Sequence, residues 1–280
     1  MSRAFEAFLK VDAERSGTDV RDLAAEVLPV DERQAPYQAP KFRGEPGEVL
    51  QPLYGDSEGE GPKLQPHTLE IDDKQRDELM KLIQQVFMMP GAAAPRTIVL
   101  AGTEPGNGCS WISCRMADVL ASNVQSPVCI VDANLRSPGL HQFFGVENHH
   151  GLSDALESTE PIRNFLRPLG RPNLWLLSCG ANATDQRSLL SSDRMRFRLS
   201  ELRQFFGYVL VDSPALSLGN EGVVLSRAAE GVILVLKANS SRRGAARKTI
   251  EDLQSADVRV LGAILNHRAF PIPKVIYDML

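Results

Sequence analysis

The chain has 280 residues and lacks any apolar run approaching 18 residues, and its first residues contain no hydrophobic segment of signal-peptide type. We therefore expect a soluble protein that does not insert into a membrane by itself. The chain also lacks an excess of basic residues. Its formal net charge is −4 and its pI is about 5.8, so bulk charge does not support nucleic-acid binding.

Cysteine is scarce, with four residues in the whole chain, and no two of them form a C-x-x-C pair. This spacing argues against a zinc site of the common cysteine type. We expect reduced thiols rather than disulfides, which is typical of a cytoplasmic protein.

The length suits one domain of about 200 residues with tails, and 43% hydrophobic content is ordinary for a globular protein. Residues 1–28 contain two short amphipathic stretches, which predict an interaction segment; a frayed tail is the alternative. Residues 29–70 hold seven of the 18 prolines and are predicted to be a disordered linker. We expect a folded domain over residues 71–270 and a C-terminal tail over 271–280.

Apolar runs of strand length alternate with amphipathic helical patterns through the predicted domain. This alternation predicts an α/β fold with a mainly parallel sheet and helices on both faces. The predicted strands cover residues 97–101, 128–131, 174–177, 208–211, 232–236 and 258–265, and the predicted helices include 73–88, 153–156, 162–166, 188–206, 219–228 and 243–254.

The loop after the first predicted strand has the layout of a phosphate-binding loop, G-x-x-x-x-G-K-[ST]. Glycines let successive backbone N–H groups point inward, and the following helix N-terminus favours an anion. A glycine-rich turn that only joins a strand to a helix is the alternative. The residues predicted to bind nucleotide here are Pro105, Gly106, Asn107, Gly108, Cys109, Ser110 and Trp111.

Two slots of the loop depart from the pattern. Thr103 replaces the first glycine, which is a mild change, whereas Cys109 replaces the lysine. The lysine of the motif places a positive charge beside the phosphates of the nucleotide. Such a charge pair near 4 Å is worth about 4 kcal/mol at an effective dielectric of about 20. A thiol at a helix N-terminus is expected to have a lowered pKa, and a thiolate would repel phosphate. The loop therefore predicts a nucleotide site with weak binding or weak turnover.

Two further predicted strands end in an acid, at Asp132 and at Asp212. Parallel strands bring such residues to the ligand-binding edge of the sheet. Four apolar residues before Asp212 form a Walker B pattern, in which the acid reaches magnesium through water. Ser110 is the residue type that binds magnesium in such a loop, and Asp132 can reach a magnesium shell or a water. The alternative for Asp132 is a helix or turn cap. Arg136 is predicted either to bind phosphate or to pair with a surface acid.

In their order, these motifs resemble the bacterial tyrosine kinases (BY-kinases), which accompany polysaccharide co-polymerases in capsule and exopolysaccharide export. That family lies in the MinD/ParA-like branch of P-loop ATPases. The resemblance covers roughly residues 72–268. It rests on the stretches TEPGNGCS, CIVDANLRSPGLHQFFGV, GLSDALES, NLWLLSCG, VLVDSPA and VLGAILNHR.

The resemblance implies an ATP or ADP site with Mg²⁺, in which Asn266 contacts the adenine and Arg136 is the family arginine. It further implies that Asp132 and Asp212 are catalytic, with Ser110 and Asp212 holding the magnesium and Asp132 acting as base or magnesium organiser. It also implies a C-terminal tyrosine cluster as phosphoacceptor, but only Tyr277 is present there. Asn134 and Asn220 stand where the family usually has aspartates. The arginine-rich ring-assembly motif is not recognisable before the loop.

The leading hypothesis is a degenerate BY-kinase-like protein that regulates or scaffolds exopolysaccharide or capsule synthesis and export. It would be cytoplasmic and be recruited to the inner face of the cell membrane by a co-polymerase in a separate chain. The sequence leaves open whether the chain also forms a homo-oligomer. One alternative is an active tyrosine autokinase that draws a substitute cation from Arg136, Arg242, Arg243 or a neighbouring subunit. Another is a MinD/ParA-like positioning ATPase, which would need a membrane helix or a DNA-binding face.

Overall fold

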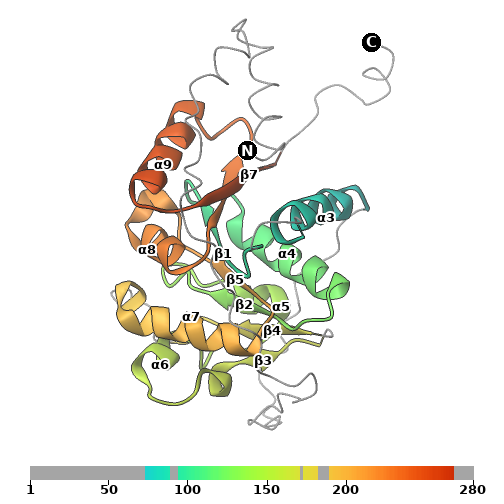
Figure 1. The fold of residues 1–280 in the computed structure, drawn as a ribbon, viewed down its shortest axis with the longest axis vertical. Coiled ribbons are helices and arrows are strands. Elements are labelled where there is room, and N and C mark those ends of the chain that lie inside the picture. The colour runs from blue at the N-terminus through green and yellow to red at the C-terminus, as the bar shows by residue number, and fades with distance from the viewer. Residues whose placement is uncertain (1–72, 89–93, 171–172, 182–188, 268–280) are drawn as a thin grey trace, which may run out of the picture.

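The computed structural model describes residues 73–88, 94–170, 173–181 and 189–267. The predicted interaction segment, the predicted linker and Tyr277 lie outside these ranges. Helices and strands alternate along most of the described chain, except that α5 is followed by α6 and β3 by β4 (Figure 1). Their bounds are α3 (Asp73–Phe87), β1 (Thr97–Gly102), α4 (Cys109–Asn123), β2 (Val128–Asp132), α5 (Leu140–Phe144), α6 (Leu152–Glu157), β3 (Arg167–Pro168), β4 (Leu174–Leu177), α7 (Asp193–Phe205), β5 (Tyr208–Asp212), α8 (Glu221–Ala228), β6 (Val232–Lys237), α9 (Arg243–Ser255) and β7 (Val260–Asn266).

The strands form one seven-stranded sheet in the order β3-β4-β2-β5-β1-β6-β7. Every pair is parallel except β3 with β4, which is a two-residue antiparallel pairing at one edge. The predicted α/β class with a mainly parallel sheet is therefore confirmed. Because β5 and β1 lie at the centre, the loops that follow them meet at the middle of one sheet edge.

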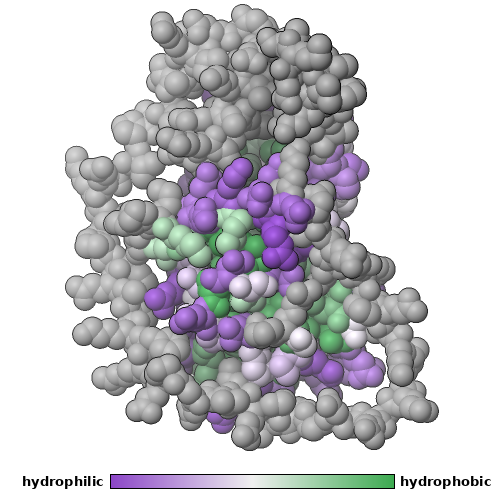
Figure 2. Space-filling view, turned by 90° about the vertical axis from the view of Figure 1, so that its right-hand side faces the viewer, coloured by the Kyte–Doolittle hydropathy of each residue, from purple (hydrophilic) through white to green (hydrophobic). Residues whose placement is uncertain are grey.

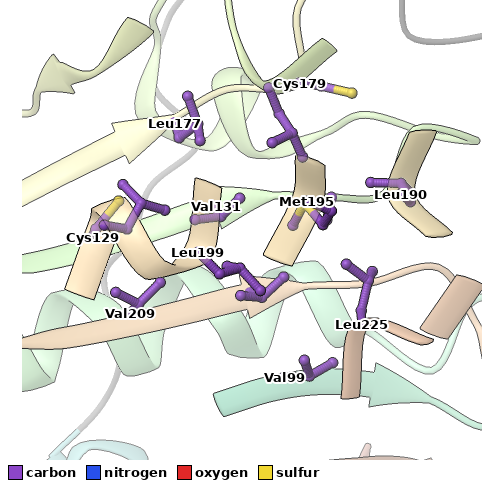
Figure 3. Close-up of a cluster of buried hydrophobic side chains, with 14 of the residues drawn as sticks. Val99, Cys129, Val131, Leu177, Cys179, Leu190, Met195, Leu199, Val209 and Leu225 are labelled. Atoms are coloured by element: carbon purple, nitrogen blue, oxygen red, sulfur yellow. The ribbon is translucent and has the colours of Figure 1, made fainter. Parts of the chain in front are cut away.

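Both faces of the sheet are buried under helices, as predicted. On one face, Val99 and Val209 of the strands pack with Leu199 of α7 and Leu225 of α8 (Figure 3). On the other face, residues of β1 pack against α3, α4 and α5. Successive strand residues point to opposite faces, so a strand buried on both sides reads as a continuous apolar run.

Several element boundaries differ from the sequence prediction. The helix predicted over 188–206 begins at Asp193, and Leu190 is buried in a short 3₁₀ turn before it. Residues 162–166 also form a 3₁₀ turn rather than an α-helix. Strand β3 and helix α5 were not predicted, because elements of two and five residues are too short to show a period.

The surface on the side of α3 mixes hydrophobic and hydrophilic residues where it is described (Figure 2). Within the described ranges, no helix combines the length and the apolarity needed to cross a membrane.

A buried arginine joins α7 to the segment after α6. The guanidinium of Arg198 donates to the backbone carbonyls of Ala155, Ser158 and Glu160 at 2.7–2.8 Å, and to the Glu201 carboxylate at 2.6 Å. Its side chain is 5% exposed. The guanidinium satisfies carbonyls at the end of α6, where a helix leaves its last carbonyls without partners.

We predict that Arg198→Met destabilises the protein by about 2–4 kcal/mol, because the substitution keeps the apolar stem but leaves buried carbonyls and a carboxylate unpaired. Urea unfolding followed by circular dichroism measures the change. Arg196→Met is the matched control, since Arg196 is 61% exposed and pairs with an exposed aspartate; we expect a change within about 0.5 kcal/mol. Equal effects of the two variants would contradict the role of the network.

Candidate nucleotide site

The phosphate-binding loop lies between β1 and α4, as predicted. Gly106 and Gly108 have φ of 78° and 81°, in the left-handed region that favours glycine. Helix α4 begins at Cys109. The loop thus has the backbone curl that the motif requires, and it leads into a helix N-terminus that favours an anion.

Side-chain hydrogen bonds fix the shape of this loop. The Asn107 amide donates to Thr103 Oγ1 at 3.0 Å and to the Val235 carbonyl of β6 at 2.9 Å. The Asn266 amide, at the end of β7, donates to the Asn107 carbonyl at 2.9 Å. Asn107 is 3% exposed, whereas Pro105 and Gly106 are exposed at the loop tip. Asn107 therefore braces the loop, while the tip is open to a ligand.

Asp212 ends β5 beneath the start of α4. Its carboxylate accepts hydrogen bonds from Ser110 Oγ at 2.6 Å and from Ser113 Oγ at 3.0 Å. Asp132 ends the neighbouring strand β2 and stands directly in register with Asp212. The structure therefore brings together Ser110, Asp132 and Asp212, the three residues predicted to bind magnesium.

The Asp132 carboxylate also organises the turn that follows β2. It accepts backbone N–H bonds from Asn134, Gly139 and Leu140 at 3.0–3.2 Å. The capping alternative for Asp132 is thus observed in the geometry. It does not displace the carboxylate from its place beside Asp212.

Both aspartates are fully buried, and this raises their pKa. Burial, reinforced by the charge of Asp212, raises the pKa of Asp132 to about 7, against the lowering effect of its three N–H partners. Burial raises the pKa of Asp212 to about 6, and hydrogen bonds from Ser110 and Ser113 oppose the shift. The site therefore holds two carboxylates in surroundings that are short of positive charge.

Cys109 occupies the lysine slot, directly before Ser110, whose hydroxyl donates to the Asp212 carboxylate. Burial and the charge of Asp212 raise the pKa of this thiol well above its ordinary value. The expectation of a lowered pKa is therefore wrong. Burial and the charge of Asp212 outweigh the effect of the helix N-terminus, so the thiol stays neutral.

Two other predicted nucleotide-binding residues have protein partners. Arg136 forms an ion pair with Glu221 at the start of α8, which is the alternative given for it from the sequence. Trp111 lies in α4, with the Arg115 guanidinium 3.8 Å from its ring centroid. His267 was not predicted, yet its ring lies beside Gly108. Its only sequence signal is that it follows Asn266.

The chemistry of these groups fits a hard divalent cation better than it fits the phosphates of a nucleotide. Magnesium prefers oxygen ligands such as the Ser110 hydroxyl and the two carboxylates, and a bound cation would offset their paired negative charge. For phosphates, the loop offers backbone N–H groups and a helix N-terminus. Position 109, however, supplies a neutral thiol in place of a cation.

Comparison with known proteins bears directly on this site. EpsB from Ralstonia solanacearum is 31% identical over 195 residues, which cover 70% of this chain and 26% of EpsB. The tyrosine-protein kinase Etk of Escherichia coli K12 is 28% identical over 169 residues, which cover 60% of this chain and 23% of Etk. The chain is a homologue of bacterial tyrosine kinases. It spans about a quarter of the length of these curated relatives, and no protein-family model matches it.

Solved structures agree on the fold of this kinase homologue. The kinase domain of Etk superposes with a TM-score of 0.63 at 24% identity, covering 76% of this chain and 88% of that domain. The septum site-determining protein MinD of Pyrococcus horikoshii, solved with Mg-ADP, gives a TM-score of 0.53 at 21% identity, covering 66% of this chain and 77% of MinD. The predicted MinD/ParA-like P-loop fold is therefore confirmed.

We predict that Asp212→Asn flattens the dependence of stability on pH in the absence of divalent cations. The folded state holds the Asp212 proton with a pKa of about 6, against an ordinary value of 3.8. The stabilising contribution is therefore complete below about pH 4 and is lost as the pH rises through about 6. Urea unfolding in EDTA at several pH values measures the slope. Asp193→Asn, at a 96% exposed side chain, should keep the wild-type slope, and an unchanged slope in Asp212→Asn would contradict the prediction.

We also predict that the native thiols react slowly with a disulfide reagent near pH 8, at least about tenfold slower than in the urea-unfolded chain. Cys109 has a raised pKa, and the three other cysteines are buried. The time course of reagent absorbance gives the rate. Cys109→Ser should leave the native rate nearly unchanged. A fast phase of one thiol that this variant removes would show that Cys109 is reactive.

Proposed function

We propose that this chain is a regulatory or scaffolding component of exopolysaccharide or capsule synthesis and export. It keeps the fold of a bacterial tyrosine kinase, binds ATP or ADP weakly or not at all, and has little phosphoryl-transfer activity. The observation that carries the proposal is Cys109, which stands in the lysine slot and supplies a neutral thiol there in place of a positive charge.

A neutral thiol cannot stabilise the charge that develops on a transferred phosphoryl group. Loss of one well-placed electrostatic donor costs about 3 kcal/mol, or about a hundredfold or more in rate. Asn134 adds to this effect. It stands where the resembled family usually has a second aspartate, and its backbone N–H only caps Asp132. Asn220 likewise supplies an amide just before α8, where a further carboxylate is common in that family.

The proposed partner is a membrane-embedded polysaccharide co-polymerase in a separate chain, which would recruit this cytoplasmic protein to the inner face of the membrane. This part of the proposal is supported by the resemblance of the motifs to BY-kinases, which accompany such co-polymerases, and by homology to the tyrosine-protein kinase Etk. A scaffolding role needs a stable fold more than it needs a competent phosphate site. The hydrophobic clusters on both faces of the sheet stabilise that fold, and the hydrogen bond from Asn266 to Asn107 holds the loop.

An active tyrosine autokinase is the second candidate. The observation in its favour is the Ser110, Asp132 and Asp212 arrangement, in which the metal-binding oxygens predicted from the sequence lie together. This candidate requires a cation from elsewhere. Arg136, one source considered, is already paired with Glu221.

We predict that Cys109→Lys raises the affinity of the full chain for ADP and Mg²⁺ by at least about tenfold, because it restores a charge at the phosphates. Titration calorimetry gives the affinity. Cys109→Gln is the control, since it is comparably long but uncharged and should bind like wild type. Equal gains in both variants would show that size rather than charge limits the site.

Incubation with ATP and Mg²⁺, followed by detection of phosphotyrosine, tests the activity directly. We expect no phosphorylation by the wild-type chain. Phosphotyrosine that forms on wild type and disappears in Asp212→Ala would overturn the proposal in favour of the autokinase.

A further inference from the structure

The end of β7 places a histidine on the phosphate-binding loop. The Nε2 atom of His267 lies 3.6 Å from the point at which a Cβ on residue 108 would stand, and the Asn266 amide nitrogen lies still closer to that point. A side chain at position 108 would collide with these groups. The φ of 81° at this position also favours glycine. Position 108 directly precedes Cys109, so the imidazole lies one residue from the vacated lysine slot.

The backbone holds His267 in this position. Its φ is 57°, in the left-handed region, where histidine is enriched among non-glycine residues. Its backbone N–H donates to Asn266 Oδ1 at 2.9 Å, while the other end of the same amide donates to the Asn107 carbonyl. One asparagine side chain thus ties both the loop and His267 to the end of β7. The His267 side chain remains exposed.

The loop lacks a positively charged side chain at the lysine slot, and the imidazole of His267 lies close to that slot. Cys109 carries no positive charge there, and Arg136 is paired with Glu221. An imidazole donates a hydrogen bond from a ring nitrogen and carries a positive charge when protonated. Hydrogen bonds from such groups to phosphate oxygens are among the stronger kinds in proteins.

We propose that His267 is a nucleotide-binding residue that donates from Nε2 to a phosphate oxygen of ADP or ATP. It provides part of the contact that position 109 has lost. This inference deepens the proposed function and rests on the weak nucleotide binding that it allows. It concerns affinity only and needs no phosphoryl transfer.

The test is calorimetric titration of the full chain with ADP and Mg²⁺, up to millimolar ADP. His267→Ala should weaken wild-type binding by about tenfold. In the Cys109→Lys background the same substitution should have an effect below about twofold, because the lysine then supplies the charge. His267→Lys should restore the affinity of wild type or exceed it. Adenosine, which has no phosphate, should bind His267→Ala and wild type equally.

His149→Ala is the matched control. That histidine is also exposed, with a 70% exposed side chain near Glu147, and its removal should leave ADP binding unchanged. The inference is overturned if His267→Ala binds ADP like wild type, if neither binds at millimolar ADP, or if His267→Ala weakens adenosine as much as ADP. Phosphotyrosine on the wild-type chain would overturn the proposed function while leaving this comparison of affinities intact.

Discussion

The parallel pairing of β2, β5 and β1 is the constraint on which the candidate site depends. In this register Asp132 stands opposite Asp212, and Leu100, near the end of β1, stands opposite Asp212 from the other side. Parallel strands end at the same edge, so the phosphate loop and both carboxylates converge there without any direct sequence proximity. Burial of both sheet faces also leaves both carboxylates without exposure to solvent.

Much of this arrangement was predictable from sequence because it rests on periodicity and on parallel topology. The apolar runs identified the central strands, and the acids at their ends identified the site edge. The raised pKa of the Cys109 thiol was not predictable, since it depends on burial and on the Asp212 carboxylate from a strand about a hundred residues later. The position of His267 depends on a left-handed turn that local sequence does not specify. Strand β3 exists only through its pairing with β4.

The electrostatics of the site follow from a missing positive charge. Two buried carboxylates with raised pKa lie below a loop whose lysine slot holds a neutral thiol. A divalent cation, if bound, would be held by the carboxylates and would offset their charge. Nucleotide phosphates would then depend on the backbone N–H groups of the loop, the helix N-terminus and the cation. The proposed weak binding of nucleotide would follow from such a site, which keeps the loop shape of the motif but lacks the charge of its lysine.

The shape of the loop does not depend on the residue at position 109. Asn107 is anchored to Thr103 and β6, Asn266 anchors Asn107, and the two glycines supply the curl. None of these contacts involves a charge at the lysine slot. A substitution at that slot therefore removes electrostatic stabilisation of phosphate while leaving the fold and the surrounding surface intact. This separation of shape from charge is the physical condition under which a kinase fold can lose its chemistry and still serve a partner as a scaffold.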